Sequence, residues 1–215
     1  MSLESNPAGD YPQVSSTAYV HPSATLIGNV VVEDRVFVGP HAVIRADEPG
    51  PDGTVMSIVI GEGANIQDCA VIHALGGTGV TIGPKSSIAH AAVIHGPCEI
   101  GFGCFVGFRS VVFRATLGDG AIVLHRALVD GVVVPKGLSV PSMTHVSSQE
   151  DVDRLSRATP DMNAFVHRVC TTNLQLAQAM LKNKKGANGT ASYECELTHP
   201  RSRAAGPHVT RHLPT

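Results

Sequence analysis

Residues 82–112 have the sequence IGPKSSIAHAAVIHGPCEIGFGCFVGFRSVV. An aliphatic residue occupies every sixth position of this stretch: Ile82, Ile88, Ile94, Ile100, Val106 and Val112. An α-helix has a period of about 3.6 residues and a strand a period of about 2, so neither favours one position in six. Hexapeptide repeats of a parallel β-helix do, because each repeat forms one short strand and one corner, and three repeats complete a coil of about 18 residues.

The same period continues on both sides of this stretch. The aliphatic positions are Val20, Leu26, Val32, Val38, Ile44, Ile60, Ile66 and Ile72 before it, and Leu117, Val123, Val129, Val134 and Val140 after it. Two interruptions, residues 49–53 and 76–79, are rich in Gly and predict loops that project from the prism. The period alone does not give the handedness of the coil, and parallel crossovers are normally right-handed.

The sequence outside the repeat predicts the domain organisation. We expect a flexible N-terminus at 1–14, a β-helix catalytic domain at 15–146, helices at 147–183 and a disordered tail at 184–215. Apolar residues between Met162 and Met180 recur at helical spacing, so this helix should pack along the prism. The tail is polar and rich in Gly, Pro, Arg and His, which is typical of disorder.

The composition argues against several classes of function. Charged residues make up 16% and the net charge is −2, so no basic face is expected for nucleic acid or a membrane surface. The chain has neither a leader pattern nor a long apolar window, which predicts a cytoplasmic protein. The 5 cysteines form no CxxC, which argues against a disulfide framework and a thiolate zinc site.

Three histidines stand out by their place in the repeat. Aligning the coils puts Arg45, His73 and His95 in one column of outward side chains spaced about 4.8 Å apart, so His73 and His95 should be close enough to share a metal. His90 should project from another face and reach a metal only on a neighbouring prism, as in a three-fold assembly. Three imidazoles with an open position form the ligand set of a hydrolytic or hydration zinc centre. Taken singly, such histidines are more often ordinary surface residues.

Five short segments resemble the gamma-class carbonic anhydrases. They are residues 44–48 (IRADE), 65–68 (NIQD), 73–75 (HAL), 89–97 (AHAAVIHGP) and 106–110 (VGFRS). Residues 134–180 are similar to the related N-terminal domain of the carboxysome scaffold protein. The resemblance covers roughly residues 15–182 and implies a left-handed parallel β-helix, a triangular prism, with a C-terminal α-helix packed along it.

The resemblance also implies an activity. A gamma-class carbonic anhydrase is a lyase that reversibly hydrates CO2 to bicarbonate with a metal-bound hydroxide. It implies a homotrimer in which His73 and His95 of one chain and His90 of the next hold Zn2+ at the subunit interface. Fe2+ or Co2+ would suit the same ligands, because imidazoles discriminate weakly among these metals.

Roles for other residues follow from the same resemblance. Glu48 resembles the carboxylate that accepts or relays the proton, Gln67 the amide that orients hydroxide or bicarbonate, and Asn65 a second polar residue that lines the site. The alternatives are a solvated loop position for Glu48 and a corner position for Asn65. Three charged residues resemble an ion-pair group that locks the subunits together: Arg45, Asp47 and Asp68.

One departure from the family pattern concerns proton export. Gly76 stands where the family prototype carries a proton-shuttling Glu in a long acidic loop, and the loop here is short. We therefore expect lower turnover and a strong dependence on buffer. The four phenylalanines at 102, 105, 108 and 113 form a predicted cluster that suits core or interface packing, or else a CO2 pocket.

Two other functions remain open at this point. A metal-binding trimer without activity would serve as a scaffold, and carboxysome-type partners would then be expected. A hexapeptide acyltransferase has the same prism and uses a catalytic His with an acyl-CoA. It does not need three histidines in this phase, which favours the carbonic anhydrase reading.

Overall fold

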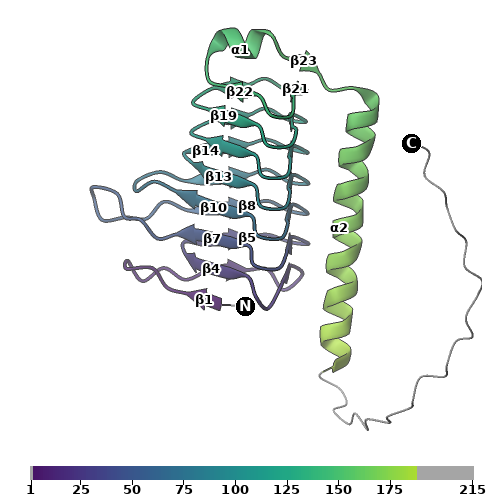
Figure 1. Cartoon of the computed structure of the whole chain (residues 1–215). Coiled ribbons are helices and arrows are strands. Elements are labelled where there is room, and N and C mark those ends of the chain that lie inside the picture. The colour runs from purple at the N-terminus through teal and green to yellow at the C-terminus, as the bar shows by residue number, and fades with distance from the viewer. Residues whose placement is uncertain (1, 188–215) are drawn as a thin grey trace, which may run out of the picture.

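The chain winds into a three-walled parallel β-helix with a long helix alongside it (Figure 1). This computed structural model describes residues 2–187, with side chains up to residue 183. Successive strands occupy successive walls, so each of the three sheets collects about every third strand of the chain. The fold class predicted from the six-residue period and the resemblance, a left-handed β-helix with a C-terminal helix, is confirmed.

The strands of each wall are short. The first sheet contains β1 (Ser2–Glu4), β4 (Thr25–Gly28), β7 (Val43–Ala46), β10 (Val71–Ala74), β13 (Val93–Gly96), β16 (Val111–Phe113), β19 (Leu128–Asp130) and β22 (His145–Val146). The second sheet contains β2 (Gln13–Val14), β5 (Val30–Val32), β8 (Ile58–Ile60), β11 (Val80–Ile82), β14 (Cys98–Ile100), β17 (Thr116–Leu117) and β20 (Val133–Val134). The third sheet contains β3 (Tyr19–Val20), β6 (Phe37–Val38), β9 (Asn65–Ile66), β12 (Ser87–Ile88), β15 (Phe105–Val106), β18 (Ile122–Val123), β21 (Leu138–Val140) and β23 (Ser156–Arg157).

The repeated aliphatic residues form the core of the prism. In the first sheet Leu26, Ile44, Ile72 and Ile94 are partners on consecutive strands, and each is 0% exposed. Burying a side chain of this size contributes about 1.5–3 kcal/mol. Because every coil adds such residues to all three walls, the stack is stabilised mainly by the ladders, and the short strands need little intrinsic stability.

The expectation of a flexible N-terminus at 1–14 is not met by the structure. β1 adds an edge strand to the first sheet, where Leu3 is the register partner of Leu26, and β2 does the same in the second sheet. The buried Asn6 donates a hydrogen bond from Nδ2 to the carbonyl of Ala46 (3.0 Å). Residues 2–14 therefore belong to the prism, and the period does not reveal this because Leu3 lies 11 residues before Val14 and not six.

The C-terminal helices begin where the repeat stops. α1 (Gln149–Asp153) starts at a capping box made by Ser148 and Asp151, and α2 (Pro160–Ala187) follows β23, which runs antiparallel to β21. α2 covers the third sheet, where Val166 packs with Phe105, and Ala177 packs with Tyr19 and Phe37. Of the predicted tail at 184–215, the first four residues continue α2 and the remainder lies outside the described residues. Among the described residues, no helix is long and apolar enough to cross a bilayer.

Candidate metal centre

His73 and His95 lie side by side on the outer face of the first sheet. They are register partners on β10 and β13, and each follows an interior isoleucine, so both rings point outward. Nδ1 of His73 lies 3.3 Å from Nε2 of His95, and the ring centroids are 5.1 Å apart. The structure thus places the two rings as the alignment of the coils predicts.

Charged side chains surround the other nitrogen of His73. Nη2 of Arg45, one strand below on β7, lies 3.2 Å from His73 Nε2. Asp47 Oδ1 and Glu48 Oε1 each lie 3.4 Å from the same nitrogen, and the His73 side chain is only 13% exposed. We call these five residues (Arg45, Asp47, Glu48, His73 and His95) the imidazole-pair group.

Two buried polar atoms of this group have incomplete hydrogen bonding. Arg45 Nε approaches Asp47 Oδ2 to 3.2 Å, yet Arg45 Nε and Asp47 Oδ1 have no partner with hydrogen-bond geometry among the described residues. The two charges attract, but the bond is not aligned. An unsatisfied buried polar atom costs about 1–3 kcal/mol, so a metal, a water or another subunit that completed this group would stabilise it.

The other predicted site residues gather on a different wall. Asn65, on β9 of the third sheet, is 1% exposed, and its Nδ2 donates to Ser87 Oγ (2.7 Å). Gln67 Nε2 donates to Asn65 Oδ1 (2.9 Å). Asn65 is therefore a buried strand residue, which excludes the alternative of a corner position. Asp68 and His90 follow at the corner beyond this sheet, and we call these four residues (Asn65, Gln67, Asp68 and His90) the corner group.

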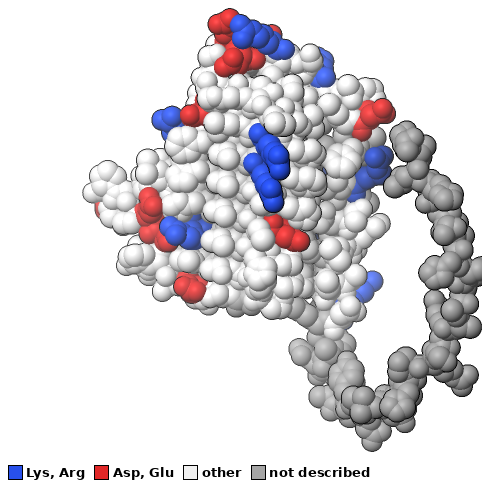
Figure 2. Space-filling view, viewed as in Figure 1, with Lys and Arg blue, Asp and Glu red and all other residues white. Residues whose placement is uncertain are grey.

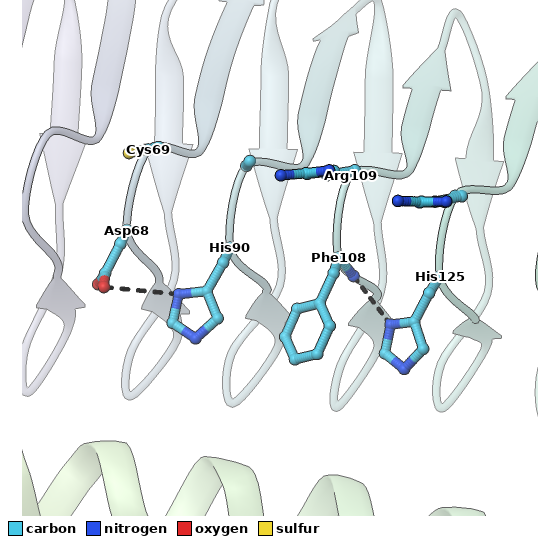
Figure 3. A pocket seen from close by; sticks show the side chains of 8 residues that line it. Asp68, Cys69, His90, Phe108, Arg109 and His125 are labelled. Atoms are coloured by element: carbon cyan, nitrogen blue, oxygen red, sulfur yellow. Dashed lines mark hydrogen bonds and ion pairs between the residues drawn. The ribbon is translucent and has the colours of Figure 1, made fainter.

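His90 lies between Asp68 and Phe108 (Figure 3). Its Nδ1 lies 3.7 Å from Asp68 Oδ2, and its ring stacks on Phe108 with centroids 5.3 Å apart. Phe108 stacks in turn on His125 at 4.5 Å, and its N–H donates to His125 Nδ1 (3.0 Å). These rings line a pocket of about 570 Å3. The His90 side chain is still 53% exposed, so its ring contacts these neighbours and remains accessible from outside the chain.

The two groups remain separate within one chain. Across residues 2–183, no side-chain hydrogen bond or ion pair joins the imidazole-pair group to the corner group. Nor do the described residues contain three His, Cys, Asp or Glu side chains close enough to hold a metal ion. Within one chain, the predicted ligands His73 and His95 therefore lie together, and the third, His90, lies apart.

The imidazole pair fits a metal by its spacing. Zinc takes imidazole nitrogens at about 2.0–2.1 Å in tetrahedral geometry, which places two of its ligand atoms about 3.3 Å apart. The His73–His95 separation has this value, although a hydrogen bond between the rings would give the same distance. These two donor nitrogens suit a divalent cation, while the carboxylates of Asp47 and Glu48 lie at the other nitrogen of His73.

The predicted phenylalanine cluster does not form. Phe105 is buried beneath α2 against Phe165, whereas Phe108 stacks on His90 and Phe113 lies 5.3 Å from His95. Each predicted outward ligand at 90 and 95 thus has a phenylalanine one coil further along. The sequence carries the signal for this pairing, since both partners lie one coil of 18 residues after the histidine.

Charged side chains are sparse on one face of the molecule. The face seen in Figure 2 is mostly uncharged, and its basic and acidic residues occur in small groups of both signs. That face therefore carries no extended acidic or basic surface.

Comparisons with known proteins give relatives by sequence and a solved structure with the same fold. No family model matches the sequence. The chain is 38% identical over 179 residues to the carboxysome assembly protein CcmM of Nostoc sp., a match that covers 79% of this chain and 31% of that protein. It is 32% identical over 195 residues to the carbonic anhydrase of Methanosarcina thermophila, covering 80% and 76% of the two chains. A crystal structure of a hexapeptide transferase family protein from Anaplasma phagocytophilum superposes with a TM-score of 0.68 at 24% identity, covering 83% of this chain and 97% of that one.

Proposed function

Because this chain belongs to the gamma-class carbonic anhydrase family, we propose that it catalyses the reversible hydration of CO2 to bicarbonate. One observation carries the proposal: a nitrogen of His73 lies 3.3 Å from a nitrogen of His95, and a carboxylate and a guanidinium contact the other nitrogen of His73. A third imidazole, that of His90, is accessible on another wall. This is a ligand set for a divalent metal together with a group that can accept a proton.

The metal would be held by residues of two subunits. His73 and His95 of one chain supply two nitrogens, and His90 of a second chain supplies the third. Zn2+ suits three imidazoles, and Fe2+ or Co2+ would use the same set. When bound, such an ion supplies a nucleophile at neutral pH, because it lowers the pKa of a coordinated water to about 7.

The remaining residues bind, orient and accept protons. Glu48 takes up the proton that hydration releases, since its carboxylate lies 3.4 Å from His73 and is part-exposed. Gln67 donates a hydrogen bond to the oxygen of hydroxide or bicarbonate, and the buried Asn65 fixes its amide. Asp68 orients the His90 ring, as carboxylates do for histidine ligands in other metal sites.

A homotrimer would complete the site. Each chain carries one imidazole pair and one separate His90, so a cyclic arrangement gives every pair a third ligand and leaves no ligand unused. Arg45 and Asp47 would then complete their hydrogen bonding at the subunit interface, together with Asp68.

A second candidate function rests on the other relatives. The chain spans 31% of the Nostoc protein's length and 25% of that of a Synechocystis carboxysome assembly protein to which it is 36% identical. An assembly role with carboxysome-type partners is therefore a distinct proposal for this chain, and a metal site could serve structure in it.

Stopped-flow CO2 hydration separates the two functions. The protein, purified both anaerobically and aerobically, is assayed alongside its content of Zn, Fe and Co. A rate that rises with bound metal and is abolished by chelation supports the hydratase. A fully metal-loaded protein with no rate above buffer would support the assembly function instead.

A further inference from the structure

Glu48 is connected to a second loop as well as to His73. Its Oε1 lies 3.4 Å from His73 Nε2, while its Oε2 accepts a hydrogen bond from the N–H of Gly76 (3.2 Å). Gly76 belongs to the short loop between β10 and β11, directly after the strand that carries His73. One carboxylate thus links the imidazole pair to the backbone of the next loop.

The two loops concerned are packed backbone against backbone. A Cβ added to Gly76 would lie 2.6 Å from the carbonyl oxygen of Pro49, and one added to Gly50 would lie 2.8 Å from Cα of Gly77. Neither position leaves room for a side chain. The approach that brings the Gly76 N–H to Glu48 therefore depends on glycine at these positions.

Each loop is also fixed internally. Leu75 O accepts hydrogen bonds from Thr78 N–H (2.9 Å) and from the Thr78 hydroxyl (2.6 Å). In the other loop, Gly50 N–H donates to Thr54 O (2.7 Å). The N–H of Gly76 is thus presented to the carboxylate by a short, hydrogen-bonded turn.

We infer that Gly76 is a positioning residue for Glu48. The loop supplies no carboxylate of its own, but its amide binds one oxygen of Glu48 and keeps the other directed at His73. The inference rests on the proposed function, in which Glu48 accepts the proton. Beyond that function, the inference gives the short loop between β10 and β11 a role in catalysis through the backbone N–H of Gly76.

A double-mutant cycle tests the inference through activity. Gly76→Ala should lower kcat by about tenfold, since a displacement near 1 Å at a reacting group can cost about a hundredfold, while metal content stays unchanged. Glu48→Gln should lower kcat at least as much. If Gly76 acts through Glu48, the double variant is no slower than Glu48→Gln within about twofold. If the loss of kcat in the double variant equals the product of the two single losses, the inference is overturned.

A control variant separates positioning from general loop damage. Gly53 lies in the same loop as Gly50 with a φ of +80°, and a Cβ there would meet nothing within 4 Å. Asn tolerates this conformation, so Gly53→Asn should keep full kcat. A loss equal to that of Gly76→Ala would show that any change in these loops disturbs the site.

A measurement without catalysis keeps the inference distinct from the proposed function. In metal-free protein labelled with 15N-glycine, Glu48→Gln should move the amide resonance of Gly76 and leave that of Gly53 in place. If the metal-loaded wild-type protein is inactive but Glu48→Gln moves the Gly76 resonance, the hydratase is refuted and the Glu48–Gly76 contact is retained. An active protein in which the Gly76 resonance does not move overturns the positioning role alone.

Discussion

His73 and His95 are 22 residues apart in the sequence, yet Nδ1 of the first lies 3.3 Å from Nε2 of the second. A regular coil has about 18 residues, so the extra residues of this coil leave the prism as the loop at 75–79. The strands on either side keep their register, and the rings therefore meet.

Replacing either ring of the pair should empty the metal site. Loss of an outer-sphere partner already lowers metal affinity by about 10- to 100-fold, so His95→Ala, which removes a ligand, should lower it further. Elemental analysis after dialysis measures the bound metal, and circular dichroism checks the fold. His167→Ala, on the exposed side of α2, is the matched control and should retain its metal. Full occupancy in His95→Ala would refute the assignment.

Mixing two inactive variants should restore part of the site. His90→Ala and His95→Ala are each expected to lack metal, but a co-expressed mixture contains intact pairs that face intact His90 residues. With random assembly into cyclic trimers, half of the pairs are intact and half of those meet a usable His90, so about one quarter of the sites recover. Metal content and CO2 hydration should both return to that level. A mixture as empty as its parents would contradict the two-subunit site.

The aliphatic ladder should dominate stability. Ile82 is 0% exposed on β11 of the second sheet, which carries neither group of site residues, so Ile82→Ala should reduce the free energy of unfolding by about 2–5 kcal/mol through lost burial and a cavity. Val133, on the same sheet, is 60% exposed, and Val133→Ala should change the free energy of unfolding by less than about 0.5 kcal/mol. Urea denaturation followed by circular dichroism compares the two. Equal effects would mean that the ladder is not the main source of stability.

Thiol chemistry should distinguish the cysteines by burial. Burial raises the pKa of Cys104 to about 11, and it also raises the pKa values of Cys98 and Cys170, so few thiolates form there near pH 8. Cys69 is exposed. Maleimide labelling with peptide mass spectrometry should modify Cys69 in the native protein and the other three described cysteines only after denaturation. Rapid labelling of Cys104 would contradict its place inside the prism.

The same burial gives a pH dependence with a definite sign. The folded-state pKa of Cys104 is raised from the ordinary 9.0 to about 11, so its contribution to stability is complete below pH 9 and is lost as the pH rises toward 11. Cys104→Ala should flatten the decline in the free energy of unfolding between these values. An unchanged profile would point to other groups.

Much of the architecture was predictable because it repeats. The six-residue period fixes which residues face inward, and Ile72 and Ile94 therefore place His73 and His95 on one outer column. The flanking phenylalanines obey the same rule. The N-terminal coil was missed because Leu3 lies 11 residues before Val14 and not six, so the period that Val14, Val20 and Leu26 keep breaks off there.

The sequence by itself determined the prism, its aliphatic ladders and the pairing of two imidazoles, since burial of a regularly spaced side chain is a local property that each coil repeats. Only the tertiary structure decided that Asn65 lies buried beside Gln67, that His90 is held between Asp68 and Phe108, and that the N–H of Gly76 binds Glu48. Those contacts depend on how far each loop bulges from its coil and on which wall each outward side chain leaves. The six-residue period specifies neither of these two features.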